Sequence, residues 1–135
     1  MTKRAGFMPV AAAHAVTPAW EWLPAEAITP KLGLCLTWDS SSGQLEVVGT
    51  GKPDYVCMME AGAAVTAGDL IPVMKVDGWE FETVLNANDS GLKPGCKRDI
   101  YSGGLKLSTG TSYNHFQVTQ VFGTSAGDAV RGYFV

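Results

Sequence analysis

The stretch Val65–Val84 constrains the fold more than any other part of this chain. It reads as a turn, an apolar run, a second turn and a second run. Gly68 can adopt the positive φ of a sharp turn without steric cost, and the Asp69 side chain can hydrogen-bond the backbone there. We therefore predict that a strand begins directly after Asp69.

Asp77-Gly78 separates the two apolar runs of this stretch. An Asp-Gly pair in that position is the strongest short-range signal for a β-hairpin. After it, Trp79 and Phe81 alternate with Glu80 and Glu82, which is the period of two that a half-buried strand shows. We predict that the turn joins two paired antiparallel strands, and that Trp79 and Phe81 face the same buried side.

The turn at Gly68 recurs further along the chain. Gly95 precedes a run that begins at Lys97, and Gly127-Asp128 precedes the C-terminal run. We interpret the three as strand entries of one kind, which is typical of small all-β folds. Their spacing, roughly thirty residues, is too irregular to predict a solenoid repeat.

Short strands separated by glycine-rich turns are expected along most of the chain. They are predicted at 32–38 and 44–48 (a hairpin), 55–59 (a central buried strand), 96–102, 105–107, 116–122 and 129–135, with an exposed tip at 108–114. With the two strands around Asp77-Gly78, this predicts an all-β fold without helices. The expected architecture is a small compact β-barrel or sandwich of about eight or nine short strands.

Residues 1–30 differ from the rest and are predicted to form an extended N-terminal arm beside a single β domain at 31–135. Prolines at 9, 18, 24 and 30 leave little room for a helix. The arm is too apolar for a disordered tail, so its large side chains should be covered by this domain or by another chain. The predicted partner-binding residues are Phe7, Met8, Pro9, Val10, Trp20 and Trp22.

Composition narrows the function classes. Charged residues make up only 17% of the 135 residues, and the net charge is −3. A thinly charged chain buries much of itself or meets other chains, and an acidic one has no field that attracts nucleic acid. No run approaches the roughly 18 apolar residues of a membrane-spanning helix, so no membrane partner is expected.

The N-terminus and the cysteines carry no specific signal. Lys3 and Arg4 precede a short apolar run, but Pro9 interrupts it, so we do not predict a signal peptide. Cys35, Cys57 and Cys96 are scattered and odd in number, which suits half-buried free thiols better than a disulfide framework or a zinc site.

No constellation of catalytic or metal-binding residues is apparent. His14 and His115 are the only histidines, and neither has an acidic companion at ligand spacing. Glu80 and Glu82 share a strand face, where carboxylates usually serve only solvation. We therefore predict a non-enzymatic protein without a metal or cofactor. Among the tryptophans, Trp38 and Trp79 are expected in the core, although a lectin-like aromatic platform is an alternative.

The layout resembles a known family. A proline-punctuated arm leads into residues 34–47, a hydrophobic strand, an Asp-Ser-Ser-Ser-Gly turn and a second strand, and Val-x-x-Gly-Asp turns follow. This is similar to the small capsid decoration, or cement, proteins of tailed bacteriophages, the class of the lambda head-stabilising protein. The residues predicted to form structural turns along the chain are Gly68, Asp69, Asp77, Gly78, Gly95, Gly127 and Asp128.

The resemblance implies a protein made in the host cytoplasm and located on the outer surface of the virion capsid. It implies a homotrimer that binds the major capsid protein and ties neighbouring subunits together. Three alternatives stay open. They are another virion part, such as a head–tail connector or tail subunit, a carbohydrate-binding module, and a small enzyme.

Overall fold

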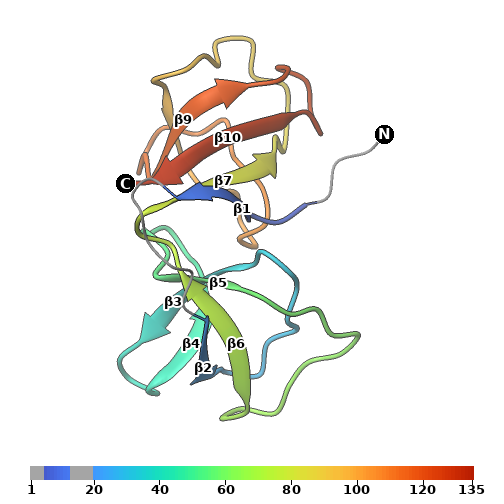
Figure 1. The fold of residues 1–135 in the computed structure, drawn as a ribbon, viewed down its shortest axis with the longest axis vertical. Coiled ribbons are helices and arrows are strands. Elements are labelled where there is room, and N and C mark those ends of the chain that lie inside the picture. Colours follow the sequence, from blue (N-terminus) through green and yellow to red (C-terminus); the bar gives the residue numbers. More distant parts are fainter. Residues whose placement is uncertain (1–4, 13–19) are drawn as a thin grey trace.

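The structure, a computed structural model, describes residues 5–12 and 20–135, and these residues form ten strands and no helix (Figure 1). The strands are β1 (Met8–Ala12), β2 (Trp20–Pro24), β3 (Cys35–Asp39), β4 (Gln44–Val47), β5 (Tyr55–Cys57), β6 (Leu70–Lys75), β7 (Trp79–Val84), β8 (Lys97–Arg98), β9 (Phe116–Val121) and β10 (Ala129–Phe134). The all-β prediction is confirmed.

The strands form two antiparallel sheets of five strands each. One, the β10 sheet, has the order β1-β7-β10-β9-β8, and the other, the β6 sheet, has the order β2-β6-β5-β3-β4. In Figure 1 the β10 sheet occupies the top of the view and the β6 sheet the bottom. Neither sheet closes into a barrel, so the arrangement is sandwich-like.

Two hydrophobic clusters form the core, and the larger one joins the two sheets. The larger cluster contains side chains from both sheets, among them Val56 and Met74 of the β6 sheet and Val118 and Val130 of the β10 sheet. The smaller cluster consists mainly of side chains of the β6 sheet, including Ile71. Four phenylalanine rings of the larger cluster contact one another with centroids 5.2–5.5 Å apart, an arrangement that aromatic pairs favour: Phe7, Phe81, Phe116 and Phe134.

Two backbone hydrogen bonds between Ala25 and the turn Gly68-Asp69 mark the start of β6, and we call this pair of bonds the clamp. Gly68 has a φ of 94°, as the third position of a type II turn requires. Its N–H donates to the carbonyl of Ala25 at 2.9 Å, and the Ala25 N–H donates to the carbonyl of Asp69 at 2.9 Å. The Asp69 carboxylate also accepts from the N–H of Thr66 at 3.0 Å, which closes the turn. The clamp therefore fixes where β6 begins relative to the end of β2.

The same clamp recurs at three other glycines, so the predicted strand entries at Gly95 and Gly127 are confirmed. Gly33 adds one that was not predicted, because its N–H donates to Cys57 O at 2.7 Å and the Cys57 N–H donates to Leu34 O at 2.9 Å. Gly127 exchanges these bonds with Leu85, which fixes the entry of β10 against the end of β7, at 2.9 and 3.0 Å. Gly95 does the same with Val118, at 2.8 Å in both directions. The two glycines have φ values of 87° and 94°, respectively. Asp128 repeats the turn-closing bond of Asp69, to Ser125 N at 2.9 Å.

Four strands of each sheet share one arrangement, β2-β6-β5-β3 in the β6 sheet and β7-β10-β9-β8 in the β10 sheet, and β4 has no strand counterpart. β6 lies between β2 and β5, and β10 lies between β7 and β9. After the clamp, Glu26 N–H donates to Leu45 O and Asn86 N–H donates to Leu107 O, both at 2.9 Å. The chain is therefore a structural duplication, from β2 to Val76 and from β7 to the C-terminus, and β1 is an extra strand on the edge of β7.

The predicted Asp77-Gly78 hairpin is wrong. Gly78 has the expected positive φ of 84°, but β6 and β7 belong to different sheets and do not pair. An Asp-Gly pair specifies a local reversal of the backbone, whereas pairing partners are chosen by long-range burial. Phe81 is buried and Trp79 packs against the larger cluster, as predicted.

Most of the other predicted strands are present, with shifted ends. β3 and β4 form the predicted hairpin, with Asp39 opposite Gln44, and β5 is a central strand between β6 and β3. The strand predicted at 96–102 shortens to β8. Residues 105–107 form no strand, and Leu107 makes only isolated bridges to Leu85 and Ile100.

The prediction of an arm separate from the β domain is corrected for the described residues. β1 pairs with β7 and β2 pairs with β6, so the N-terminal region supplies one strand to each sheet. The Phe7 N–H donates to Gly33 O at 2.8 Å, where the absence of a Cβ on Gly33 permits close approach. Phe7 is 0% exposed, because tertiary packing places this apolar residue in the domain's own core.

We expect Phe7→Ala to lower the free energy of unfolding by about 3–5 kcal/mol, the usual cost of truncating a buried phenylalanine. Val10→Ala in the same strand is the control and should cost far less, because Val10 is exposed. Urea denaturation of both variants measures the difference. Equal stability of Phe7→Ala and wild type would show that the N-terminal region is not part of the core.

Candidate functional site

Exposed apolar side chains gather on β2 and the adjacent start of β6. Trp20 is 57% exposed, Trp22 63% and Leu70 58%. Trp20 and Trp22 share one face of β2 because strand side chains alternate, and Leu70 joins that face since it lies opposite Pro24. We call Trp20, Trp22, Pro24 and Leu70 the β2 patch. A group of neighbouring exposed apolar side chains commonly marks a surface that another molecule covers.

The six predicted partner-binding residues are therefore divided. Trp20 and Trp22 lie together in the β2 patch. Val10 is exposed on β1, and Met8 and Pro9 are half-buried there, so these three belong to the other sheet. Phe7 is buried against Phe116 and Phe134, where a partner cannot contact it. The sequence could not separate these cases, because all six are apolar residues near prolines.

The carboxylates of β7 have structural partners. Thr119 Oγ1 donates to Glu80 Oε2 at 2.8 Å, and Arg131 Nε donates to Glu82 Oε1 at 3.0 Å. Arg131 also lies over the Phe122 ring, 5.3 Å from its centroid. These contacts tie β7 to its neighbour β10 and, across β10, to β9, so the face predicted to be merely solvated contributes to sheet cohesion.

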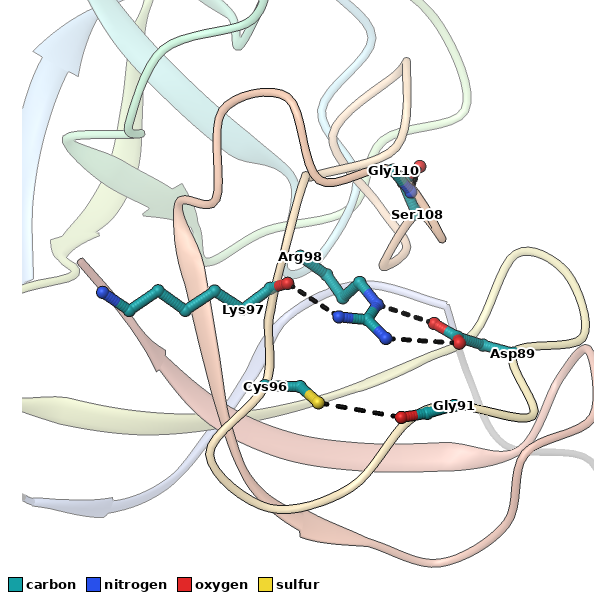
Figure 2. Close-up of polar contacts among 7 residues, drawn as sticks. All are labelled: Asp89, Gly91, Cys96, Lys97, Arg98, Ser108 and Gly110. Carbon is teal, nitrogen blue, oxygen red and sulfur yellow. Dashed lines mark hydrogen bonds and ion pairs between the residues drawn. The ribbon is translucent and has the colours of Figure 1, made fainter.

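A mostly buried ion pair fastens the loop that follows β7. Arg98 Nε donates to Asp89 Oδ2 at 2.8 Å, and a second guanidinium nitrogen donates to Oδ1 at 3.3 Å, as Figure 2 shows. The Cys96 thiol points at the carbonyl of Gly91 beside this pair, with 3.7 Å between the sulfur and the oxygen. A bidentate pair of this kind orients a loop strongly. Its role here is to hold residues 89–98 together.

The three cysteines are free thiols. Cys35 and Cys57 are buried, and burial raises the pKa of both, which keeps them protonated and unreactive. His115 Nδ1 lies 3.1 Å from Val135 O, which accounts for one ring nitrogen through a backbone contact. His14 lies outside the described residues.

One group of described acidic residues has metal-like spacing. Carboxylate oxygens of Glu26, Asp39 and Glu46 lie within 4.8 Å of one another. A hydrogen bond with Asp39 raises the pKa of Glu26, and the backbone N–H of Ser41 lowers the pKa of Asp39. Exposed acidic groups commonly gather without an ion. The prediction of a protein without a metal stays a prediction.

Asp99 organises the tip at 108–114, which the sequence suggested was soft. Its carboxylate accepts from the backbone N–H groups of Ser112, Tyr113 and Asn114, at 3.0, 2.7 and 2.7 Å. Burial raises the pKa of Asp99, but the three N–H donors together outweigh it and hold that pKa below its ordinary value. No local pattern could reveal this, because the donors lie far along the chain.

A hollow of about 310 Å³ adjoins Asp99. The exposed rings of Tyr101 and Tyr113 stand at it, and the side chains of Thr50 and Ser102 supply hydroxyl groups. Because the charge of Asp99 is taken up by backbone donors, the hollow offers aromatic faces and neutral polar groups. Its chemistry suits an uncharged, hydroxylated ligand.

A second hollow, of about 410 Å³, lies at the ends of β3, β5 and β6. Trp38 lines it, and the backbone N–H of Trp38 donates to Asp54 Oδ2 at 3.0 Å. Lys52 and Asp77 form an ion pair at 2.8 Å on its wall. Trp38 is therefore partly exposed rather than in the core as predicted.

Comparisons with known proteins leave the family open: no protein-family model matches the chain, and no curated protein is significantly similar to it. Within the described ranges there is no helix long and apolar enough to cross a membrane.

Asp99 predicts a dependence of stability on pH. Because its pKa is lower in the folded protein than the roughly 3.9 of an unfolded chain, its stabilisation is present above that value and is lost as pH falls through the folded pKa. Asp99→Asn should lower the free energy of unfolding near pH 7 by roughly 1–3 kcal/mol. The variant should also lose less stability than the wild type when the pH is lowered.

Thermal melting of wild type and Asp99→Asn between pH 2 and 7 measures both effects. The two melting curves should converge at the acid end. Parallel pH profiles separated by a constant shift would show that the Asp99 charge is not responsible. Asp77→Asn, at an exposed residue, serves as the control.

Proposed function

We propose that this protein is a non-enzymatic virion structural protein of a tailed bacteriophage. It binds the outer surface of the capsid and stabilises contacts between major capsid protein subunits. The observation that carries the proposal is the β2 patch, where Trp20 and Trp22 are 57% and 63% exposed. The resemblance of the sequence to capsid decoration proteins gives the patch its proposed partner.

Large aromatic side chains carry most of the energy at protein interfaces. Burying one such ring is worth about 1.5–3 kcal/mol, so two rings and Leu70 can support specific attachment after ordering costs are met. The surrounding β6 sheet is held by its own core and clamp. The patch is therefore presented on a rigid element, and little ordering free energy is lost when a partner covers it.

The physical task of such a protein is to oppose separation of subunits under internal DNA pressure. A protein bound across a subunit boundary adds its binding free energy to the cost of separation. We propose that it acts as a homotrimer, because linked copies release slowly even when each contact is modest. A particle map with trimers over the shell would support this arrangement. Rings of six or twelve copies would favour a connector or tail subunit.

Replacing both patch tryptophans should weaken attachment without unfolding the protein. We expect Trp20→Ser with Trp22→Ser to reduce affinity for purified particles at least tenfold per ring, which corresponds to about 1.4 kcal/mol each. Phe122→Ser is the matched control, because Phe122 is a similarly exposed ring directly after β9 and far from β2 in the strand order. Occupancy on particles and melting of the free protein are measured together. Unchanged occupancy by the double variant would contradict the role of the patch.

A second candidate function, binding of a carbohydrate, is favoured by the hollow between Tyr101 and Tyr113. Tyrosine faces can stack on the apolar C–H face of a sugar ring, and the nearby hydroxyls can pair with its hydroxyl groups. Glycan-array binding by wild type that is lost in Tyr113→Ser would support this function. If the wild type binds no glycan on the array, carbohydrate binding is excluded as a function.

A further inference from the structure

The sheet edges of the described residues are not protected equally. β8 is only two residues long, and β1 carries Pro9 and a register shift between Pro9 and Ala11. The edge strand β4 pairs with β3 and contacts the end of β2 through the Ala25–Leu45 bridge. Proteins blunt exposed edges by short strands, prolines, bulges or lysines. β2 instead presents Trp20 and Trp22, and Pro24 only at its end.

On the outer side of β2, the backbone groups at Trp20 and Trp22 have no backbone partner among the described residues, whereas just past Pro24 that side meets Leu45 of β4. In the clamp, the backbone N–H and the backbone carbonyl of Ala25 both point toward the start of β6. Because these directions alternate along a strand, Leu23 and Glu21 also face β6, whereas the backbone groups of Trp22 and Trp20 point away from it. Among the described residues, the strand β2 pairs with β6 alone.

The duplication shows what such an edge accepts. Leu85 holds the position in the second half that Ala25 holds in the first, so Glu82 and Glu80 correspond to Trp22 and Trp20. In the second half this edge is occupied, because Met8 of β1 lies opposite Glu82 and Ala11 opposite Glu80 in an antiparallel pairing. The same architecture thus forms a strand interface at β7 and leaves the equivalent edge of β2 without a described strand.

We infer that the edge of β2 at Trp20–Trp22 is a strand-acceptor site, filled by an extended segment of the major capsid subunit that pairs antiparallel with β2. This inference rests on the proposed function and specifies how the attachment is made. The segment should be uncharged, because Trp20, Trp22 and Leu70 would bury its side chains without offering a counter-charge. Main-chain bonds give the affinity in this mode, and the indoles select the side chains.

The experiment separates the Trp22 ring from its backbone N–H. Trp22→Thr removes the ring and keeps the N–H, whereas Trp22→Pro removes both and leaves the bonds of Leu23 and Glu21 to β6 in place. Binding of each to purified particles is measured with melting of the free variants. Loss of one hydrogen bond should make Trp22→Pro bind about fivefold more weakly than Trp22→Thr.

Amide hydrogen exchange of the wild type provides a readout that needs no variant. The N–H groups of Trp20 and Trp22 should exchange quickly in the free protein and at least tenfold more slowly on the particle. Slow exchange in the free monomer, or exchange that binding leaves unchanged, would overturn the inference. Equal binding by Trp22→Thr and a folded Trp22→Pro would overturn it as well, while leaving the proposed function intact. Failure of wild type to bind particles would overturn both.

Discussion

The backbone clamp at each strand entry is the interaction on which the rest of the structure depends. It needs a residue that adopts a positive φ and brings its N–H against a neighbouring strand, and Gly68 and Gly127 meet both conditions. Each clamp fixes the register of one long pair, β2 with β6 and β7 with β10. Because a one-residue slip would move every side chain to the other face, the clamps decide which residues enter the core.

The two halves use the same clamp for different purposes. In the second half, β1 covers the edge of β7, and Phe7 beside it joins a cluster of four phenylalanines. In the first half, the corresponding edge carries exposed indole rings instead of a described strand. The repeated arrangement thus contains two equivalent strand edges, and β1 of the same chain pairs with the one on β7. An interaction surface can arise in this way without any new architecture.

Several polar side chains fasten elements of the fold to one another. The pairs Arg98–Asp89 and Arg131–Glu82 join elements that hydrophobic contacts alone would leave loosely oriented. Asp99 does the same for a tip rich in small polar residues, through three backbone donors. Asp89–Arg98 and Asp99 act in loop segments where sheet hydrogen bonds are sparse, whereas Arg131 and Glu82 face each other within the β10–β7 ladder.

The sequence by itself determined the all-β class, the β3–β4 hairpin and the three strand entries, because these depend on local glycine chemistry and on alternation with a period of two. It also marked Trp20 and Trp22 as partner-binding candidates by their type. Only the tertiary structure decided that Asp77-Gly78 joins two sheets, that Phe7 is in the core, and that one architecture occurs twice. Strand pairing and burial depend on residues far apart in the chain, and turn dipeptides and apolar composition do not specify them.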